Sequence, residues 1–181
     1  VLLEFKNFSR YCIWGTDMEQ NEEDKLLIEK EHVLLFESLD GIKSKISRYE
    51  DCFFDKSNFI KWVNEEEFKK EYTKMNLCGL LNFERMNLND KDQSLEILDV
   101  LNFLEDFFIQ VDNIRMKEIF SCIDLLAFKN CIYNAYFWKN DDAEILIDFD
   151  ILAVKKMLCE IYTEFSNRDA GSQEYPFTVT R

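Results

Sequence analysis

The chain has 181 residues, a formal net charge of −14 at pH 7, one histidine, four glycines and one proline. The chain has 36 acidic residues but only 22 Lys and Arg. This excess of negative charge disfavours binding to nucleic acids or anionic membrane surfaces, because both are negatively charged. The shortage of His and Gly removes most catalytic motifs. The composition therefore favours a protein that binds a basic partner over an enzyme.

Hydrophobic residues make up 47% of the sequence, enough for the core of one domain of this size. No signal-peptide pattern opens the sequence, and no stretch approaches the roughly 18 apolar residues of a membrane span. The six cysteines include no Cys-x-x-Cys pair, so we expect reduced thiols in a cytoplasmic protein. We expect one domain over residues 1–166 and a weakly ordered tail over 167–181, where Gly, Ser and Pro end the periodicity.

The first third of the chain has the composition of β-strands. Apolar and aromatic runs predict strands over Leu2–Phe8, Tyr11–Trp14 and Val33–Phe36, with a turn at Ser9–Arg10. The acid-rich segment Met18–Lys30 is predicted to be a solvated loop or the start of a short helix.

Most of the remaining chain has helical periodicity. Short helices are predicted over 41–49 behind a cap at Ser38 or Asp40, from a cap at Asp55 or Ser57 through Val63, and over 65–75. Leu77–Asn89 permits an edge strand. Long amphipathic helices are predicted over Ser94–Val111, Arg115–Trp138 and from Asp148 or Asp150 through Ser166. Strands followed by helices predict an α+β domain in which C-terminal helices pack on a mainly antiparallel N-terminal sheet.

Catalytic constellations are poorly supported. A nucleophile–histidine site would have to use His32, and the four glycines are too isolated to form a phosphate-binding loop. One histidine without a Cys-x-x-Cys pair also disfavours structural zinc. We therefore expect no catalytic residues, no metal and no cofactor.

Two pairs of carboxylates leave an enzymatic alternative open. Asp90 with Asp92 and Asp148 with Asp150 have oxygen ligands suitable for Mg²⁺, as in a Mg²⁺-dependent hydrolase or transferase. Each pair also precedes an amphipathic helix, where Asp satisfies free amide groups. The position of the pairs favours helix capping.

Acidic clusters and nearby aromatic residues are the candidates for binding a partner. The candidate residues are Asp17, Glu19, Glu22, Glu23, Asp24, Asp141, Asp142, Glu144, Tyr136 and Trp138. Asp148 and Asp150 extend the second cluster, which contains no basic residue. Such clusters either keep a surface solvated or form an electrostatic docking face that accelerates encounter with a cation-rich partner.

Two stretches of the sequence form a distinctive pattern. One is FSRYCIW (Phe8–Trp14) followed by HVLLFESL (His32–Leu39), with Phe53-Phe54-Asp55 and Trp62 downstream; the other is Leu80–Asn82 leading to LNFLEDFFIQV (Leu101–Val111). These stretches resemble bacterial immunity proteins of contact-dependent growth inhibition and polymorphic toxin systems. The resemblance implies a cytosolic, non-catalytic inhibitor of one cognate toxin domain, often a nuclease with a basic groove. A generic acidic adaptor domain is the other non-enzymatic alternative.

Overall fold

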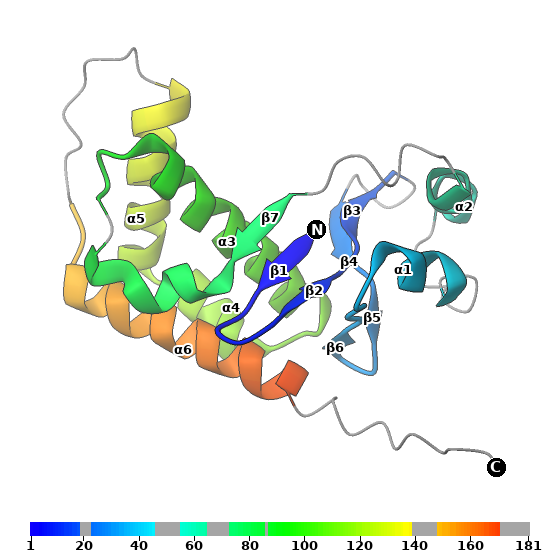
Figure 1. Ribbon diagram of the computed structural model, residues 1–181. Helices are drawn as coiled ribbons and strands as arrows, with labels where there is room; N and C mark the ends of the chain where they lie inside the picture. The colour runs from blue at the N-terminus through cyan, green and yellow to red at the C-terminus, as the bar shows by residue number, and fades with distance from the viewer. Residues whose placement is uncertain (19–22, 46–54, 65–72, 86, 139–147, 171–181) are drawn as a thin grey trace.

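The chain folds into an α+β arrangement with small sheets in its first part and helices in the rest (Figure 1). This computed structural model describes residues 1–18, 23–45, 55–64, 73–85, 87–138 and 148–170. The long helix α3 (Lys91–Gln110) lies behind the central sheet, and α6 (Ile151–Ala170) runs below it (Figure 1). The predicted α+β class, with N-terminal sheets and C-terminal helices, is confirmed, although one strand (β7, Lys74–Asn76) follows two short helices.

The strands form three small sheets within the described residues, and most pairings are antiparallel. In the central sheet, β1 (Leu2–Glu4) pairs antiparallel with β2 (Ser9–Tyr11) and parallel with β7 (Lys74–Asn76). The two other sheets are hairpins, formed by β3 (Trp14–Asp17) with β4 (Glu23–Leu26) and by β5 (Ile28–Glu29) with β6 (His32–Val33).

Two predictions for this part of the chain are wrong. Ser9–Arg10 is not a turn, because Ser9 pairs with Glu4 inside the hairpin and the reversal lies at residues 5–8. The Met18–Lys30 segment is not a loop in its described part, since it contains β4 and β5. The charged residues of β4 made this segment look like a solvated loop. In the structure Glu23 and Asp24 are exposed, while Lys25 and Leu26 are buried.

The predicted strand over Val33–Phe36 forms only in part. β6 ends at Val33, and Phe36 joins Tyr11 through an isolated antiparallel bridge. Both Val33 and Phe36 are buried, so the apolar run correctly predicted a core segment.

Two short helices follow, and both begin at predicted caps. The Ser38 hydroxyl accepts the Gly41 N–H at 3.1 Å at the start of α1 (Leu39–Lys45). Asp55 accepts the Asn58 N–H at 3.1 Å at the start of α2 (Lys56–Asn64). The rest of the first predicted helix, 46–49, and most of the third, 65–72, lie outside the described residues.

The segment after residue 73 differs from the prediction. Lys74 and Met75 belong to β7 and not to a helix, and the possible edge strand over Leu77–Asn89 is instead η4 (Leu77–Arg85), a 3₁₀ helix. Its Leu77, Leu80 and Phe83 are buried. The three-residue spacing of Leu77 and Leu80 matches the 3₁₀ period and places these two side chains on one face. The backbone is kinked at Asn82, immediately before Phe83.

The predicted helix Arg115–Trp138 is divided at Ser121–Cys122 into separate helices. They are α4 (Ile114–Phe120) and α5 (Ile123–Tyr133), and α5 continues into the π-helical turn η5 (Asn134–Trp138). The break rotates the buried face of α5, so that Leu125, Phe128 and Ile132 are buried while Ile123 is 79% exposed. The final helix α6 continues to Ala170, four residues into the predicted tail, and residues 171–181 lie outside the description.

Phenylalanine side chains connect α3 and α6 in the main core. Along α6, Val154, Leu158, Ile161 and Phe165 are fully buried, whereas Ile151 is exposed. The Phe165 ring meets Phe107 of α3 edge to face at a centroid distance of 5.2 Å. A second, smaller core under α1 and α2 contains Ile13, Leu27, Phe36, Ile42 and Phe59. None of the described helices combines the length and hydropathy needed to cross a bilayer.

We predict that Phe165→Ala lowers the free energy of unfolding by about 3–5 kcal/mol, because it leaves a cavity between α3 and α6. Leu152→Ala, on the 74%-exposed outer side of the same helix, is the control and changes stability by less than about 0.5 kcal/mol. Urea unfolding measures both. Similar losses for the two variants would contradict the packing of α6 described here.

Candidate binding surface

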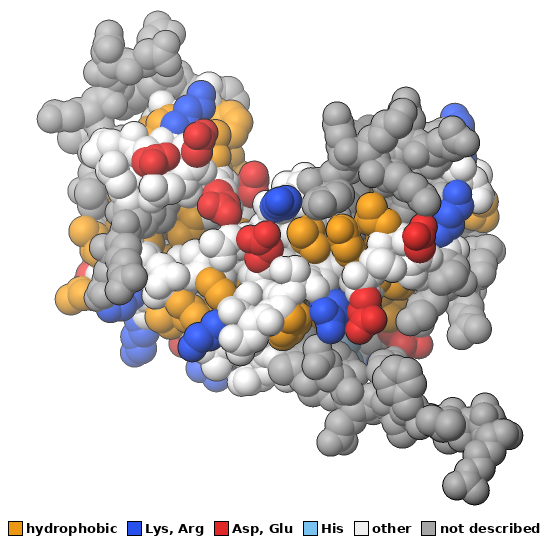
Figure 2. All heavy atoms as spheres, viewed as in Figure 1, with side chains coloured by type: hydrophobic (Ala, Val, Ile, Leu, Met, Phe, Trp, Pro, Cys, Tyr) orange, Lys and Arg blue, Asp and Glu red, His pale blue; other side chains and the backbone are white. Residues whose placement is uncertain are grey.

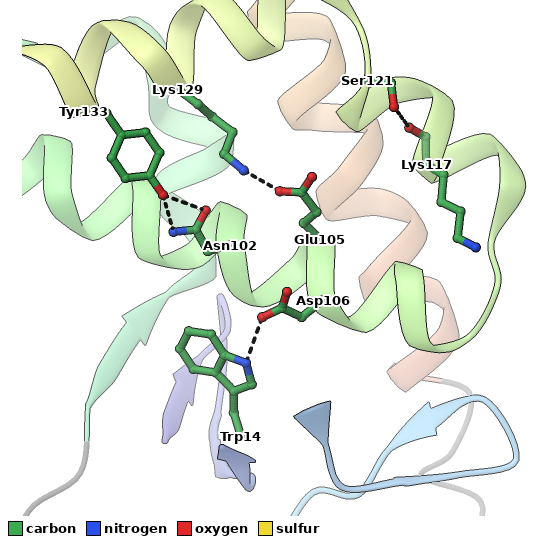
Figure 3. Close-up of polar contacts among 8 residues, drawn as sticks. All are labelled: Trp14, Asn102, Glu105, Asp106, Lys117, Ser121, Lys129 and Tyr133. Atoms are coloured by element: carbon green, nitrogen blue, oxygen red, sulfur yellow. Dashed lines mark hydrogen bonds and ion pairs between the residues drawn. The ribbon is translucent and has the colours of Figure 1, made fainter. Parts of the chain in front are cut away.

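Polar side chains of α3 connect this helix to α5 and to the β3–β4 hairpin (Figure 3). On one side, Asn102 donates to the Tyr133 hydroxyl of α5 at 3.0 Å, and Glu105 forms an ion pair with Lys129 of α5. On the other, Asp106 accepts a hydrogen bond from the Trp14 indole N–H of β3 at 3.0 Å. These contacts hold α3 in a fixed position relative to both neighbours.

Gln110 adds a further link between α3 and β4. Its side-chain oxygen accepts the Leu26 N–H and its amide donates to the Leu26 carbonyl, both at 2.9 Å. The Gln110 side chain thus satisfies both backbone groups of Leu26, as a neighbouring β-strand would. Sequence reasoning missed these polar residues because an amphipathic pattern assigns polar positions to solvent.

Asp106 is the most perturbed carboxyl group in this network. Burial raises its pKa from 3.8 to about 6, although the hydrogen bond from Trp14 opposes the shift. The nearby Asp24 and Glu105 raise the pKa further, and Lys129 lowers it. Because the folded state favours the protonated form, ionisation of Asp106 costs stability at neutral pH. That cost declines as the pH falls below about 6 and is absent only below the ordinary pKa of 3.8.

We predict that Asp106→Asn stabilises the protein at pH 7 by on the order of 1 kcal/mol, a value reduced for solvent screening of a half-buried group. The amide oxygen can still accept the Trp14 N–H. The gain should shrink at pH 5, where the wild-type carboxyl group is mostly protonated. Urea unfolding at the two pH values tests this, and an equal gain at both would contradict a role for ionisation.

The first predicted acidic cluster is split by the fold. Glu23 and Asp24 lie exposed on β4, and Asp24 accepts a hydrogen bond from the Thr16 hydroxyl at 2.6 Å. Asp17 is fully buried, so it does not belong to the exposed acidic surface. Glu19 and Glu22 lie outside the described residues.

Asp17 has a structural environment instead. Its carboxylate forms an ion pair with the buried Lys25 at 3.3 Å and accepts the Asp55 N–H at 3.1 Å. These contacts connect the β3–β4 hairpin to the start of α2. The sequence could not reveal this ion pair, because it depends on the hairpin register. In that register Asp17 lies opposite Glu23, which is two residues before Lys25 along β4.

We predict that Asp17→Ala destabilises the protein by about 3 kcal/mol or more, because it removes a buried carboxylate that pairs with the Lys25 ammonium and accepts the Asp55 N–H. Glu23→Ala, at the exposed position opposite it in the hairpin, serves as the matched control and should have an effect within about 0.5 kcal/mol. Thermal unfolding of both variants measures the difference. Equal stability of the two would show that the ion pair has no structural role.

The second cluster falls largely outside the described residues, which do not include Asp141, Asp142 and Glu144. Asp148 is exposed, and Asp150 caps α6 by accepting the Leu152 and Ala153 N–H groups. The Tyr136 hydroxyl donates to the Leu88 carbonyl at 2.6 Å, which anchors η5 to the segment before α3. Trp138 ends η5, but its side chain is not described.

An acidic groove lies between β7 and the first half of α3. It has a volume of about 460 Å³ and is lined by Lys74, Asp90, Asp92, Gln93, Leu95, Glu96 and Asp99. Figure 2 shows acidic side chains gathered beside a basic one near the position of β7. Partial burial raises the pKa of Asp99 in this groove. Helical spacing of Asp92, Glu96 and Asp99 could have indicated a common face, but not the strand opposite it.

A smaller apolar pocket of about 320 Å³ lies between β3 and α2. Trp14, Gly15 and Thr16 line it from β3, and Asn58, Phe59 and Trp62 line it from α2. Trp62 stacks on Phe59 with ring centroids 6.4 Å apart and is 43% exposed. The pocket therefore presents aromatic surface to solvent beside the Trp14–Asp106 contact.

One carboxylate of each predicted pair caps a helix. Asp90 accepts the Gln93 N–H at 3.2 Å and begins α3, as Asp150 begins α6. Over the described ranges, no group of three or more His, Cys, Asp and Glu side chains is arranged to hold a metal ion. His32 is half-buried in β6, and its Nδ1 atom is buried without a hydrogen-bond partner.

Comparisons with protein-family models, with curated proteins and with solved structures return no match for this chain.

Proposed function

We propose that this chain is an immunity protein that binds a cognate toxin domain tightly and neutralises it without catalytic activity of its own. The observation that carries the proposal is the concentration of acidic side chains in an open groove on α3, within a chain of net charge −14. The toxin domain is a basic nuclease, and the complex forms in the cytoplasm. No cofactor, nucleic acid or membrane takes part.

Charge complementarity supports a nuclease as the partner. A nuclease needs a positively charged surface to hold the phosphate backbone. An acidic protein accelerates encounter with such a surface and disfavours neutral or acidic competitors. The same charge disfavours binding of this chain to nucleic acid itself.

The rigidity of α3 supports tight binding. The helix is fixed by hydrogen bonds to Trp14 and Tyr133 and by the ion pair with Lys129, so its exposed acidic face is preorganised. A surface that is already ordered loses little conformational entropy when a partner binds. Glu23 and Asp24 of β4 and the undescribed acids of both clusters remain candidate contacts, together with Tyr136 and Trp138.

The rival functions have less support. In a Mg²⁺-dependent hydrolase the paired carboxylates would be metal ligands, but Asp90 and Asp150 accept backbone N–H groups at helix starts. A generic adaptor would share the acidic surface but would not inhibit its partner. Inhibition is therefore the property that separates the proposal from the adaptor alternative.

Affinity capture from the native cells with the tagged full chain, followed by an activity assay, tests the proposal. We expect one basic protein in stoichiometric amount, whose cleavage of plasmid DNA or total RNA stops when one equivalent of the chain is added. Heat-unfolded chain is the control. A captured partner whose activity is unaffected by excess folded chain would contradict the proposal, as would the absence of any stoichiometric partner.

A further inference from the structure

The groove beside α3 is bounded by the open edge of the central sheet. In the strand order β2-β1-β7, β7 is paired only with β1, and no described strand lies on its other side. The Leu2 N–H donates to the Thr73 carbonyl at 2.7 Å, and Met75 pairs with Leu3. Since backbone groups alternate direction along a parallel ladder, those of Lys74 point away from β1, toward the open edge.

The opposite wall of the groove is an acidic row on α3. Asp92, Glu96 and Asp99 are all exposed and follow one another at steps of four and three residues, which puts them on one helix face. Within the described part of the chain, no basic side chain forms an ion pair with any of the three. Lys74 is the one cation among the lining residues.

The spacing of the acidic residues along α3 suits an extended peptide. Along α3 the acids rise by about 6 Å and then about 4.5 Å at 1.5 Å per residue. Alternate side chains of a strand are about 6.6 Å apart. Basic side chains at every second position of an extended segment can therefore each meet a carboxylate while the backbone of the segment faces β7.

We propose that this groove receives an extended basic segment of the toxin domain, which lies along the open edge of β7 and places Lys or Arg side chains against Asp92, Glu96 and Asp99. The inference rests on the proposed function and names the surface that carries it. Strand addition at a free edge supplies backbone hydrogen bonds, and the acidic row selects for basic side chains. The raised pKa of Asp99 fits this role, because a bound cation compensates for the loss of solvation.

A labelled peptide in which Lys and Val alternate is the first probe, and its binding is followed by fluorescence anisotropy. The groove variant carries Asp92→Asn, Glu96→Gln and Asp99→Asn, and it leaves the capping residue Asp90 intact. The control variant removes the same charge outside the groove and outside both acidic clusters through Glu29→Gln, Glu37→Gln and Glu118→Gln. Circular dichroism and thermal unfolding confirm that both variants fold.

We expect the groove variant to bind the peptide about tenfold more weakly than wild type or worse, as three lost ion pairs imply. The control variant should stay within about threefold of wild type. Equal weakening of both variants would overturn the inference, because binding would then depend on net charge alone. Peptide N-methylated on alternate residues should also bind weakly, and unchanged binding would overturn pairing with the β7 edge.

The same variants separate this inference from the proposed function when they are tested on the captured toxin. Weaker inhibition by the groove variant, but not by the control variant, supports both. Equal inhibition by wild type and both variants would overturn the groove as the docking site while leaving the immunity function in place. Peptide binding that follows the groove charges, with no toxin inhibited by wild type, would overturn the proposed function and the toxin as occupant.

Discussion

The position of α3 is the constraint on which the rest of the structure depends. Its apolar residues are buried on more than one side, among them Leu101, Phe103, Leu104 and Phe107. Its inward polar residues bind Trp14, Tyr133 and Lys129, so the β3–β4 hairpin and α5 are fixed to the same helix. Only the first half of α3 keeps an exposed acidic row, and that row forms one wall of the groove beside β7. A rigid core helix thus presents charge at a defined place.

The acidic residues of this chain serve two physical roles that the fold separates. Asp17, Asp90, Asp106 and Asp150 accept hydrogen bonds from backbone N–H groups or an indole within the protein. Among the described residues, Asp92, Glu96 and Asp99 form no ion pair with a basic side chain. Their negative charges lie on one helix face and repel one another. The hydrogen-bonded carboxylates fix the positions of helices and strands. The exposed carboxylates on α3 create a negative electrostatic potential that a basic partner can neutralise.

The sequence predicted the helices with repeated apolar periodicity and the caps that begin them. Asp90, Asp150, Ser38 and Asp55 all lie where the local rules place them, because a cap needs only its neighbours. Features that depend on distant residues were missed: β7 forms because Met75 meets Leu3, and Lys25 is buried because Asp17 lies across the hairpin. The acidic groove was missed for the same reason, since one wall is a short strand that periodicity assigned to a helix.

Growth of cells that produce the captured toxin domain, alone or together with this chain, tests the central claim most directly. The account predicts growth arrest with the toxin domain alone and normal growth when wild-type chain is produced with it. Matched production of the charge-reduced groove variant should restore growth only in part. Continued arrest in the presence of folded wild-type chain at equal or higher abundance would contradict the account.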